Sequence, residues 1–253
     1  TNMFKFYTAD YEGEMVSDSL HWRDGNKDSN GVWIPKTILN DEHTKTAHII
    51  GNGPSREKIS LFLLDGQSGG EGGVTSVGQS YGCNQTFEEF SPTFLFCVNT
   101  EILEQMVLTG YYEDNIVYTT RKNLLKFPGK FHLYPHWQKL YMGPAAIRMA
   151  CADGHKRVYL IGFDFYFGEV HHLYPATDTS YLPMENTETI QSKLLRQVCS
   201  IIQLYDDVEF FHVHNTFSKR VEHQFDDFKW LSNIKPIGLF EYISQTGLGA
   251  VAK

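Results

Sequence analysis

The chain has 253 residues, 42% of them hydrophobic and 21% charged, which is enough for one large α/β domain with a substantial core. Its formal net charge of -8 offers no excess of cations for a phosphate backbone, which argues against strong nonspecific binding of nucleic acid. No apolar run approaches the roughly 20 residues of a membrane span, and no basic-then-apolar signal pattern opens the sequence.

The cysteines indicate the same kind of protein. They stand singly inside apolar stretches, without a Cys-x-x-Cys pair or a framework of short loops: Cys83, Cys97, Cys151 and Cys199. We therefore expect reduced thiols in the core of a cytoplasmic protein.

Residues 1–46 are polar and aromatic. The turn-forming run at 24–31 separates short extended pieces, which predicts a β-hairpin-like N-terminal extension. This run has the Asp-x-Asn-x-Asp spacing of a calcium loop, but no glutamate follows where such a loop needs one. We predict an extension at 1–46, one domain at 47–253, and no metal in either.

The chain is organised around the stretch 47–55, where a short apolar run ends in Gly-Asn-Gly-Pro-Ser at 51–55. The glycines permit close backbone approach, and Pro54 fits the first turn of a helix. Free N–H groups of that turn would face an anion, and Asn52 would point its amide at the ligand. A tight strand-to-helix turn without a ligand is the open alternative. A short helix to Leu64 and a glycine-rich loop at 66–73 should follow.

The rest of the chain alternates expected strands with expected helices, which is typical of βα units stacking into a parallel sheet. The expected strands span 74–80, 93–98, 115–119, 132–134, 157–165 and 208–213. The expected helices span 101–108, 143–152 and 187–205, the second with proline in its first turn and glycine just past its end. We predict a Rossmann-like, mostly parallel sheet with helices on both faces, and a C-terminal remainder that packs back across it.

The strand at 157–165 should deliver Asp164 and Tyr166 to its carboxyl end, where ligands bind in open α/β sheets. The segment that follows, about 167–186, is long and polar and carries two prolines together with His171 and His172. Its length and composition predict an active-site lid.

Four motifs now stand in register: Gly-Asn-Gly-Pro-Ser at 51–55, Cys-Asn-Gln at 83–85, Asn99 after a strand, and Tyr-Leu-Ile-Gly-Phe-Asp-Phe-Tyr at 159–166. In this order and spacing they resemble the bacterial sialyltransferases of the Campylobacter type, over roughly residues 47–205. The resemblance implies a Rossmann-like nucleotide-binding domain with a lid, CMP-sialic acid as donor, no metal, and inversion at the anomeric carbon.

The resemblance also implies which residues hold the donor. Asn52, Asn84 and Asn99 would surround its phosphate and sugar, while Gly162, Asp164 and Tyr166 would line the nucleotide. Lys139 falls where the family has an arginine near the reaction centre. The whole expected donor set is Gly51, Asn52, Gly53, Ser55, Asn84, Gln85, Asn99, Gly143, Gly162, Phe163 and Tyr166.

The sequence departs from the family at two places. Tyr141 and Met142 replace small hydroxyl residues that help to hold the donor, and a buried sugar carboxylate would lose partners there. The family's catalytic histidine is absent from 184–187, so His171 or His172 is the expected base, since imidazole accepts a proton near neutral pH. A solvated loop histidine is the open alternative for each, and Asp164 is the next candidate base.

We expect a glycosyltransferase that moves a sugar from a nucleotide-sugar donor to an acceptor hydroxyl by metal-independent inverting displacement. No Asp-x-Asp triplet that would hold a metal on a pyrophosphate appears, and His212-x-His214 offers only half a metal site. The two departures from the family leave open a donor nucleotide sugar other than CMP-sialic acid. The acceptor, a glycan or modified DNA, and homo-oligomerisation stay open too. One alternative is a phage-type DNA-modifying glycosyltransferase that uses a UDP-sugar on a hydroxymethylated base. Another is a noncatalytic nucleotide-binding or pterin-diphosphokinase-like protein.

Overall fold

The computed structural model describes residues 6–9, 15–19, 40, 43–56, 59–64, 77–127, 129–134, 139–165, 187–214 and 226–247. Near the N-terminus, β1 (Phe6–Ala9) and β2 (Met15–Ser19) pair antiparallel. The extension is thus β-rich as predicted, but both strands precede the predicted turn at 24–31, which lies outside the described residues. None of the helices within the described ranges combines the length and the apolar character that crossing a membrane requires.

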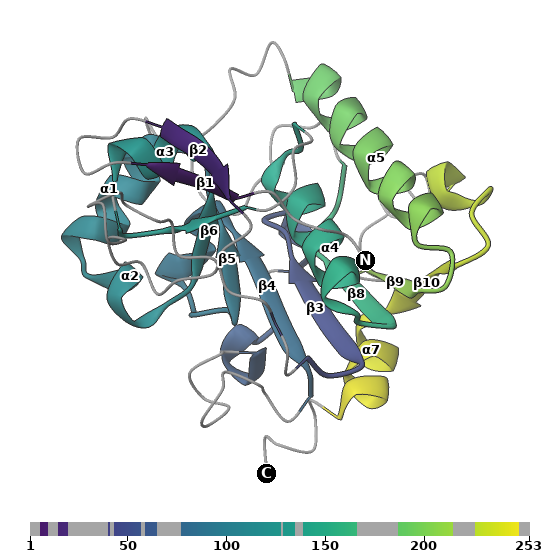
Figure 1. Ribbon diagram of the computed structural model, residues 1–253. Helices are drawn as coiled ribbons and strands as arrows, with labels where there is room; N and C mark the ends of the chain where they lie inside the picture. Colours follow the sequence, from purple (N-terminus) through teal and green to yellow (C-terminus); the bar gives the residue numbers. More distant parts are fainter. Residues whose placement is uncertain are drawn as a thin grey trace.

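An eight-stranded sheet forms the centre of the molecule (Figure 1). Its strands are β3 (Thr46–Ile50), β4 (Gln79–Cys83), β5 (Phe94–Phe96), β6 (Val117–Thr119), β7 (His132–Leu133), β8 (Arg157–Ile161), β9 (Glu209–His214) and β10 (Ile234–Gly238). They lie in the order β10-β9-β8-β3-β4-β5-β6-β7, and all neighbours are parallel. The predicted parallel α/β sheet is confirmed.

Helices and short 3-10 turns cover both faces of this sheet. They are η1 (Pro54–Arg56), η2 (Leu61–Leu64), η3 (Asn84–Glu88), α1 (Thr100–Leu108), α2 (Tyr111–Asp114), α3 (Arg121–Lys126), α4 (Met142–Asp153), α5 (Thr187–Leu204), η5 (Asp226–Phe228) and α7 (Leu239–Thr246). Helices α4 and α5 pack side by side over one face (Figure 1). On the other face α7 packs on β8–β10, and α1 and α3 pack on β5–β7.

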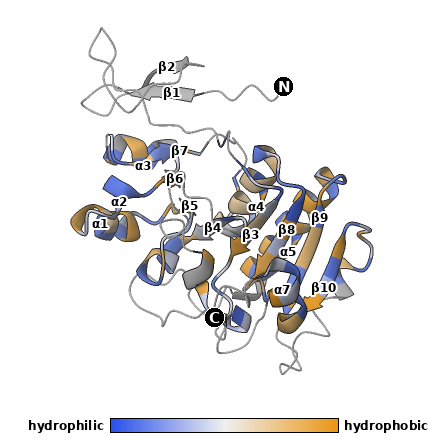
Figure 2. Ribbon diagram, turned by 90° about the horizontal axis from the view of Figure 1, so that it is seen from below, coloured by the Kyte–Doolittle hydropathy of each residue, from blue (hydrophilic) through white to orange (hydrophobic). Residues whose placement is uncertain are grey.

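The central strands are buried on both faces, which is why they read as nearly continuous apolar runs. In β8 every residue after Arg157 is buried, and in β3 every residue after Thr46 is buried. Figure 2 shows hydrophobic colour concentrated on these strands, while the covering helices mix hydrophobic and hydrophilic residues. Because successive side chains of a strand point to opposite faces, these strands pack against helices on both sides of the sheet.

Helix α4 has the predicted form. Pro144 lies in its first turn, and Gly154 ends it with a left-handed φ of +103°, a conformation that glycine adopts without steric cost. Ala145, Ala146 and Ala150 are fully buried, so the helix can lie close to the strands beneath it.

Several elements differ from the prediction, among them the helices α2, α3 and α7, which were not predicted. The expected helix over 55–64 is instead two short 3-10 turns, η1 and η2, and in the first of them Arg56 N donates to Gly53 O, three residues before it. Strand β4 begins at Gln79, near the end of the expected strand at 74–80. The edge strand β10 was not predicted, because Pro236 and its exposed neighbour Lys235 interrupt the apolar pattern of a strand. Proline is tolerated in an edge strand because its missing N–H can face the side of the strand that has no neighbour.

A buried polar network joins the amino end of β4 to the end of α4. The Tyr81 hydroxyl donates to Asp153 Oδ2 at 2.6 Å and lies 2.9 Å from His155 Nε2, and Asn40 Nδ2 donates to Tyr81 at 3.2 Å. Burial raises the pKa of Asp153 to about 7 and lowers the pKa of His155 to about 4. The carboxyl is therefore protonated in the folded protein over a pH range in which the unfolded chain is ionised.

The variant Asp153→Asn should gain stability relative to the parent as the pH rises from 5 to 7. In the parent the folded state holds a proton on Asp153 that the unfolded state has lost, so this carboxyl alone makes the free energy of unfolding fall with pH by up to about 1.4 kcal/mol per unit, a contribution that the variant lacks. The amide keeps an oxygen for Tyr81 but takes up no proton. Urea unfolding of both proteins at several pH values measures the difference.

Asp207→Asn is the matched control, because Asp207 is exposed and its Lys156 partner lowers the pKa of that carboxyl. The contribution of Asp207 to the free energy of unfolding therefore changes with pH only in more acidic solution. Parallel curves for the parent and Asp153→Asn between pH 5 and 7 would contradict the prediction.

Candidate functional site

The order of the strands defines one edge of the sheet as the place for a ligand. From β3 the chain moves outward through β4 to β7, and it then crosses back to add β8, β9 and β10 on the other side of β3. The connections that leave β3 and β8 therefore run in opposite directions. In open α/β sheets such a switch point opens a crevice at the carboxyl ends of the strands, where ligands bind.

All four motifs of the sequence end at this edge. The stretch 51–55 follows β3, 83–85 spans the end of β4, Asn99 lies shortly after β5, and 162–165 follows β8. These strands are adjacent in the order β8-β3-β4-β5. Segments as far apart in sequence as 51 and 162 are thus brought to neighbouring positions.

The glycines after β3 and β8 bring the two backbones into direct contact. Gly51 N donates to Ile161 O at 2.7 Å, and Gly53 N donates to Gly162 O at 2.8 Å. Gly162 has a φ of +73°, and a Cβ added to it would lie 2.6 Å from Gly51 O. This close approach requires glycine whether or not a ligand is bound.

Asp164 caps the turn that the sequence assigned to an external anion. Its Oδ2 accepts from Ser55 N at 2.8 Å, and its Oδ1 accepts from the Ser55 hydroxyl. A Cβ on Gly53 would lie 2.5 Å from Asp164 Oδ2, so the carboxylate fills the space beside that glycine. In this structure the negative charge at the start of η1 is supplied by the protein itself.

The Asn52 amide is also engaged within the protein. Its Nδ2 donates to Cys83 O at 3.2 Å, and its Oδ1 accepts from the Thr86 hydroxyl at 3.0 Å and from Arg56 at 3.3 Å. Asn52 is buried and ties the end of β3 to the end of β4. The structure thus places Asn52 at the predicted edge, where it holds the edge together.

Arg56 is a residue of this edge that the sequence did not single out. Only 1% of it is exposed; its Nε donates to Gly51 O at 2.7 Å, and its terminal nitrogens donate to both oxygens of Glu89 at 3.2 and 2.9 Å. No local pattern separates such an arginine from a solvated one, because Glu89 lies 33 positions away.

The other predicted donor residues take up the following places. Asn84 begins η3 with a left-handed φ of 55°, and Gln85 is buried beside it. The Asn99 side chain caps α1, accepting from Glu101 N at 2.8 Å and Ile102 N at 3.2 Å. A Cβ on Gly143 would lie 2.9 Å from the ring of Phe163, which is itself buried against the start of α4.

Backbone strain concentrates at the same edge. Among the non-glycine residues of the described ranges, Asn84 and Phe165 have a left-handed φ, of 55° and 49°. Asparagine tolerates this conformation, but phenylalanine is an outlier that the surrounding structure must hold in place. Such residues cluster at binding and active sites.

Of the four expected catalytic side chains, the structure describes those of Asp164 and Lys139. His171, His172 and Tyr166 lie outside the described residues. Lys139 is exposed, and its carbonyl oxygen accepts from Gln197 Nε2 on α5 at 3.2 Å. Met142, at the place of a family hydroxyl residue, is buried in the core.

His212 lies on β9 next to the carboxyl end of β8. Its Nε2 donates to Phe163 O at 2.7 Å, and burial lowers the pKa of the imidazole. It therefore holds the backbone just before Asp164. Over the described ranges, no three His, Cys, Asp or Glu side chains are grouped so as to hold a metal ion.

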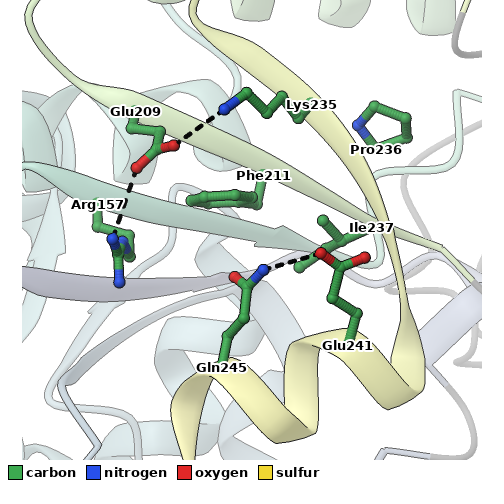
Figure 3. A pocket seen from close by; sticks show the side chains of 8 residues that line it. All are labelled: Arg157, Glu209, Phe211, Lys235, Pro236, Ile237, Glu241 and Gln245. Carbon is green, nitrogen blue, oxygen red and sulfur yellow. Dashed lines mark hydrogen bonds and ion pairs between the residues drawn. The ribbon is translucent and has the colours of Figure 1, made fainter.

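A cavity of about 390 Å³ lies away from this edge, between β8–β10 and α7 (Figure 3). Arg157 and Lys235 both pair with Glu209, at 3.7 and 3.3 Å, and Gln245 donates to Glu241 at 3.0 Å. The charged groups that line this cavity therefore largely pair with one another. Arg157 and Glu209 are the first residues of β8 and β9, so this part of the cavity lies toward the amino ends of the strands. We place the candidate site at the carboxyl ends.

No family model and no curated protein sequence matches this chain. Among solved structures, the chain is similar to the monofunctional α-2,3-sialyltransferase Cst-I from Campylobacter jejuni, with 17% sequence identity and a TM-score of 0.48. The similarity covers 70% of this chain and 78% of that chain.

Proposed function

We propose that this protein is a glycosyltransferase that moves a sugar from a nucleotide-sugar donor to an acceptor hydroxyl. The observation that supports this is the convergence of the four motifs at adjacent carboxyl ends, β8-β3-β4-β5, beside the switch point of a parallel sheet. By the resemblance of these motifs the donor is CMP-sialic acid. The strained residues Asn84 and Phe165 mark the same edge.

The proposed reaction is a direct displacement that inverts the anomeric carbon. A base takes the proton of the acceptor hydroxyl, and fixed dipoles and a cation stabilise the departing phosphate without a metal. Asn84, Gln85 and the backbone at 51–55 are proposed to contact the donor. Lys139, which is exposed beside the start of α4, is the proposed cation.

A panel of CMP, UDP, GDP and ADP, each alone and with a sugar attached, tests the proposal in two steps. A nucleotide that binds the folded protein at one hundred times its dissociation constant should add about 2.7 kcal/mol to the free energy of unfolding. The nucleotide that raises the melting temperature is then offered as its sugar conjugate, and release of free nucleotide is measured in excess chelator. We expect release to continue.

Each of the other outcomes supports a different function or mechanism for this protein. Binding without release, with or without added Mn²⁺ or Mg²⁺, indicates a noncatalytic nucleotide-binding protein. Release that chelator abolishes and Mn²⁺ or Mg²⁺ restores contradicts the metal-independent mechanism. Transfer from a UDP-sugar to hydroxymethylated DNA supports the DNA-modifying alternative, and no thermal shift with any compound contradicts the proposal itself.

A further inference from the structure

The end of β9 places a titratable side chain in line with the glycines of the candidate site. Ile50 pairs with Ile161, and Ile161 pairs with Val213. The next residues along these parallel strands are Gly51, Gly162 and His214. His214 therefore stands one strand away from the contact between Gly51 and Gly162, at the same level of the sheet.

His212 and His214 lie on the same face of β9 but differ in what they can do. His212 is 2% exposed, and its Nε2 is occupied by Phe163 O. His214, the last residue of the strand, is only partly buried. One imidazole is enclosed and holds the backbone, while the other ends the strand and is only partly buried.

His214 also has an unsatisfied nitrogen. Within the described ranges its Nδ1 is shielded from solvent and has no hydrogen-bond partner, as is also true of Nδ1 of His212, which differs in being fully enclosed. Leaving a buried polar atom unpaired costs about 1–3 kcal/mol, and such atoms in native structures require an explanation. A hydroxyl group of a bound acceptor would supply the missing partner once the groups that shield this nitrogen move aside.

The surroundings keep this imidazole uncharged near neutral pH. Burial lowers the pKa of His214, and Glu241 on α7 partly opposes that effect. His212 is likewise neutral because burial lowers its pKa, with Asp164 acting in the opposite direction. A neutral imidazole can accept a proton, whereas an imidazolium cannot.

The other described candidate is less suited to this role. Both oxygens of Asp164 already accept hydrogen bonds from Ser55. Asp164 is therefore better placed to hold the turn after β3 than to take a proton.

We propose that His214 is the general base of the transfer reaction, and that His212 positions the Phe163–Asp164 backbone beside it. This rests on the proposed glycosyltransferase function. The acceptor oxygen forms a bond to the anomeric carbon as the bond from that carbon to the donor phosphate breaks. The phosphate leaves with the electron pair, and the acceptor's proton passes to the free ring nitrogen of His214 and then to water.

The variant His214→Asn tests this role. The asparagine amide overlaps the Cγ and Nδ1 positions of the imidazole ring but cannot take up a proton near neutral pH. We expect kcat to fall by about 10² to 10⁴, the usual worth of a general base, while the thermal shift caused by the donor nucleotide is unchanged. In the parent, kcat/KM should decline on the acid side with an apparent pKa below the ordinary histidine value of 6.5, and the variant should lose this limb.

Three further measurements make the result decisive. His43→Asn, an exposed histidine before β3 at the amino edge, should keep kcat within about threefold of the parent. His214→Ala should recover part of its activity when imidazole is added, which a merely structural defect would not. His212→Asn should lower the melting temperature and weaken nucleotide binding more than His214→Asn does.

Two results would overturn the inference in distinguishable ways. If the parent transfers sugar and His214→Asn folds, keeps its acid limb and stays within threefold of the parent, His214 is not the base and the proposed function stands. If the parent transfers no sugar from any donor of the panel, the proposed function fails and His214 has no such role.

Discussion

Replacing Arg56 with Met should lower the free energy of unfolding by about 1–3 kcal/mol, the usual cost of leaving a buried polar group, here Gly51 O, without its hydrogen-bond donor. Arg56 is 1% exposed and is the donor for Gly51 O, Asn52 Oδ1 and both oxygens of Glu89. Methionine fills part of the volume but leaves Gly51 O without this donor, while Asn52 Oδ1 keeps the Thr86 hydroxyl. Chemical denaturation measures the loss.

Lys126→Met is the matched control, because Lys126 pairs with Glu104 at 2.7 Å with both side chains about half exposed. Such a surface pair contributes only about 0–1 kcal/mol. We also expect Arg56→Met to weaken nucleotide binding, since Arg56 fixes the carbonyl of Gly51 at the candidate site. Equal losses of stability in the two variants would show that Arg56 is not the internal brace described above.

Gly162→Ala should destabilise the protein by about 3 kcal/mol or more. Alanine at a φ of +73° carries a conformational penalty of roughly 1–2 kcal/mol. In addition, its Cβ would lie 2.6 Å from Gly51 O and 3.0 Å from Gly51 C, so the ends of β3 and β8 would have to separate. The free energy of unfolding and the nucleotide-induced thermal shift should both fall.

Gly247→Ala is a control that separates the conformational penalty from the steric contact between residues 162 and 51. Gly247, after α7, has a φ of +72°, but a Cβ there would meet nothing within 4 Å. Gly247→Ala should therefore show only the conformational penalty. If Gly162→Ala costs no more than Gly247→Ala, the contact between the two glycines does not demand glycine, and their role in the site has to be sought elsewhere.

The sequence by itself determined the class of fold and the strand ends at which its four motifs lie. The apolar run of β8 and the proline and glycine that bound α4 are local signals, and a local signal suffices where a strand is buried on both faces or a helix has defined ends. The four motifs likewise lie where strand ends were expected, since the position of a strand end depends mainly on nearby residues.

The tertiary structure alone decided which side chains meet at that edge. The bonds of Asp164 to Ser55 join residues 109 positions apart, and those of Arg56 to Glu89 join residues 33 apart. The register that brings His214 level with Gly162 depends on how β8 and β9 pair, and β10 was hidden because Pro236 is tolerated only at a sheet edge. Contacts of this kind follow from strand order and register, which no local stretch of sequence encodes, because each depends on how distant segments pack together.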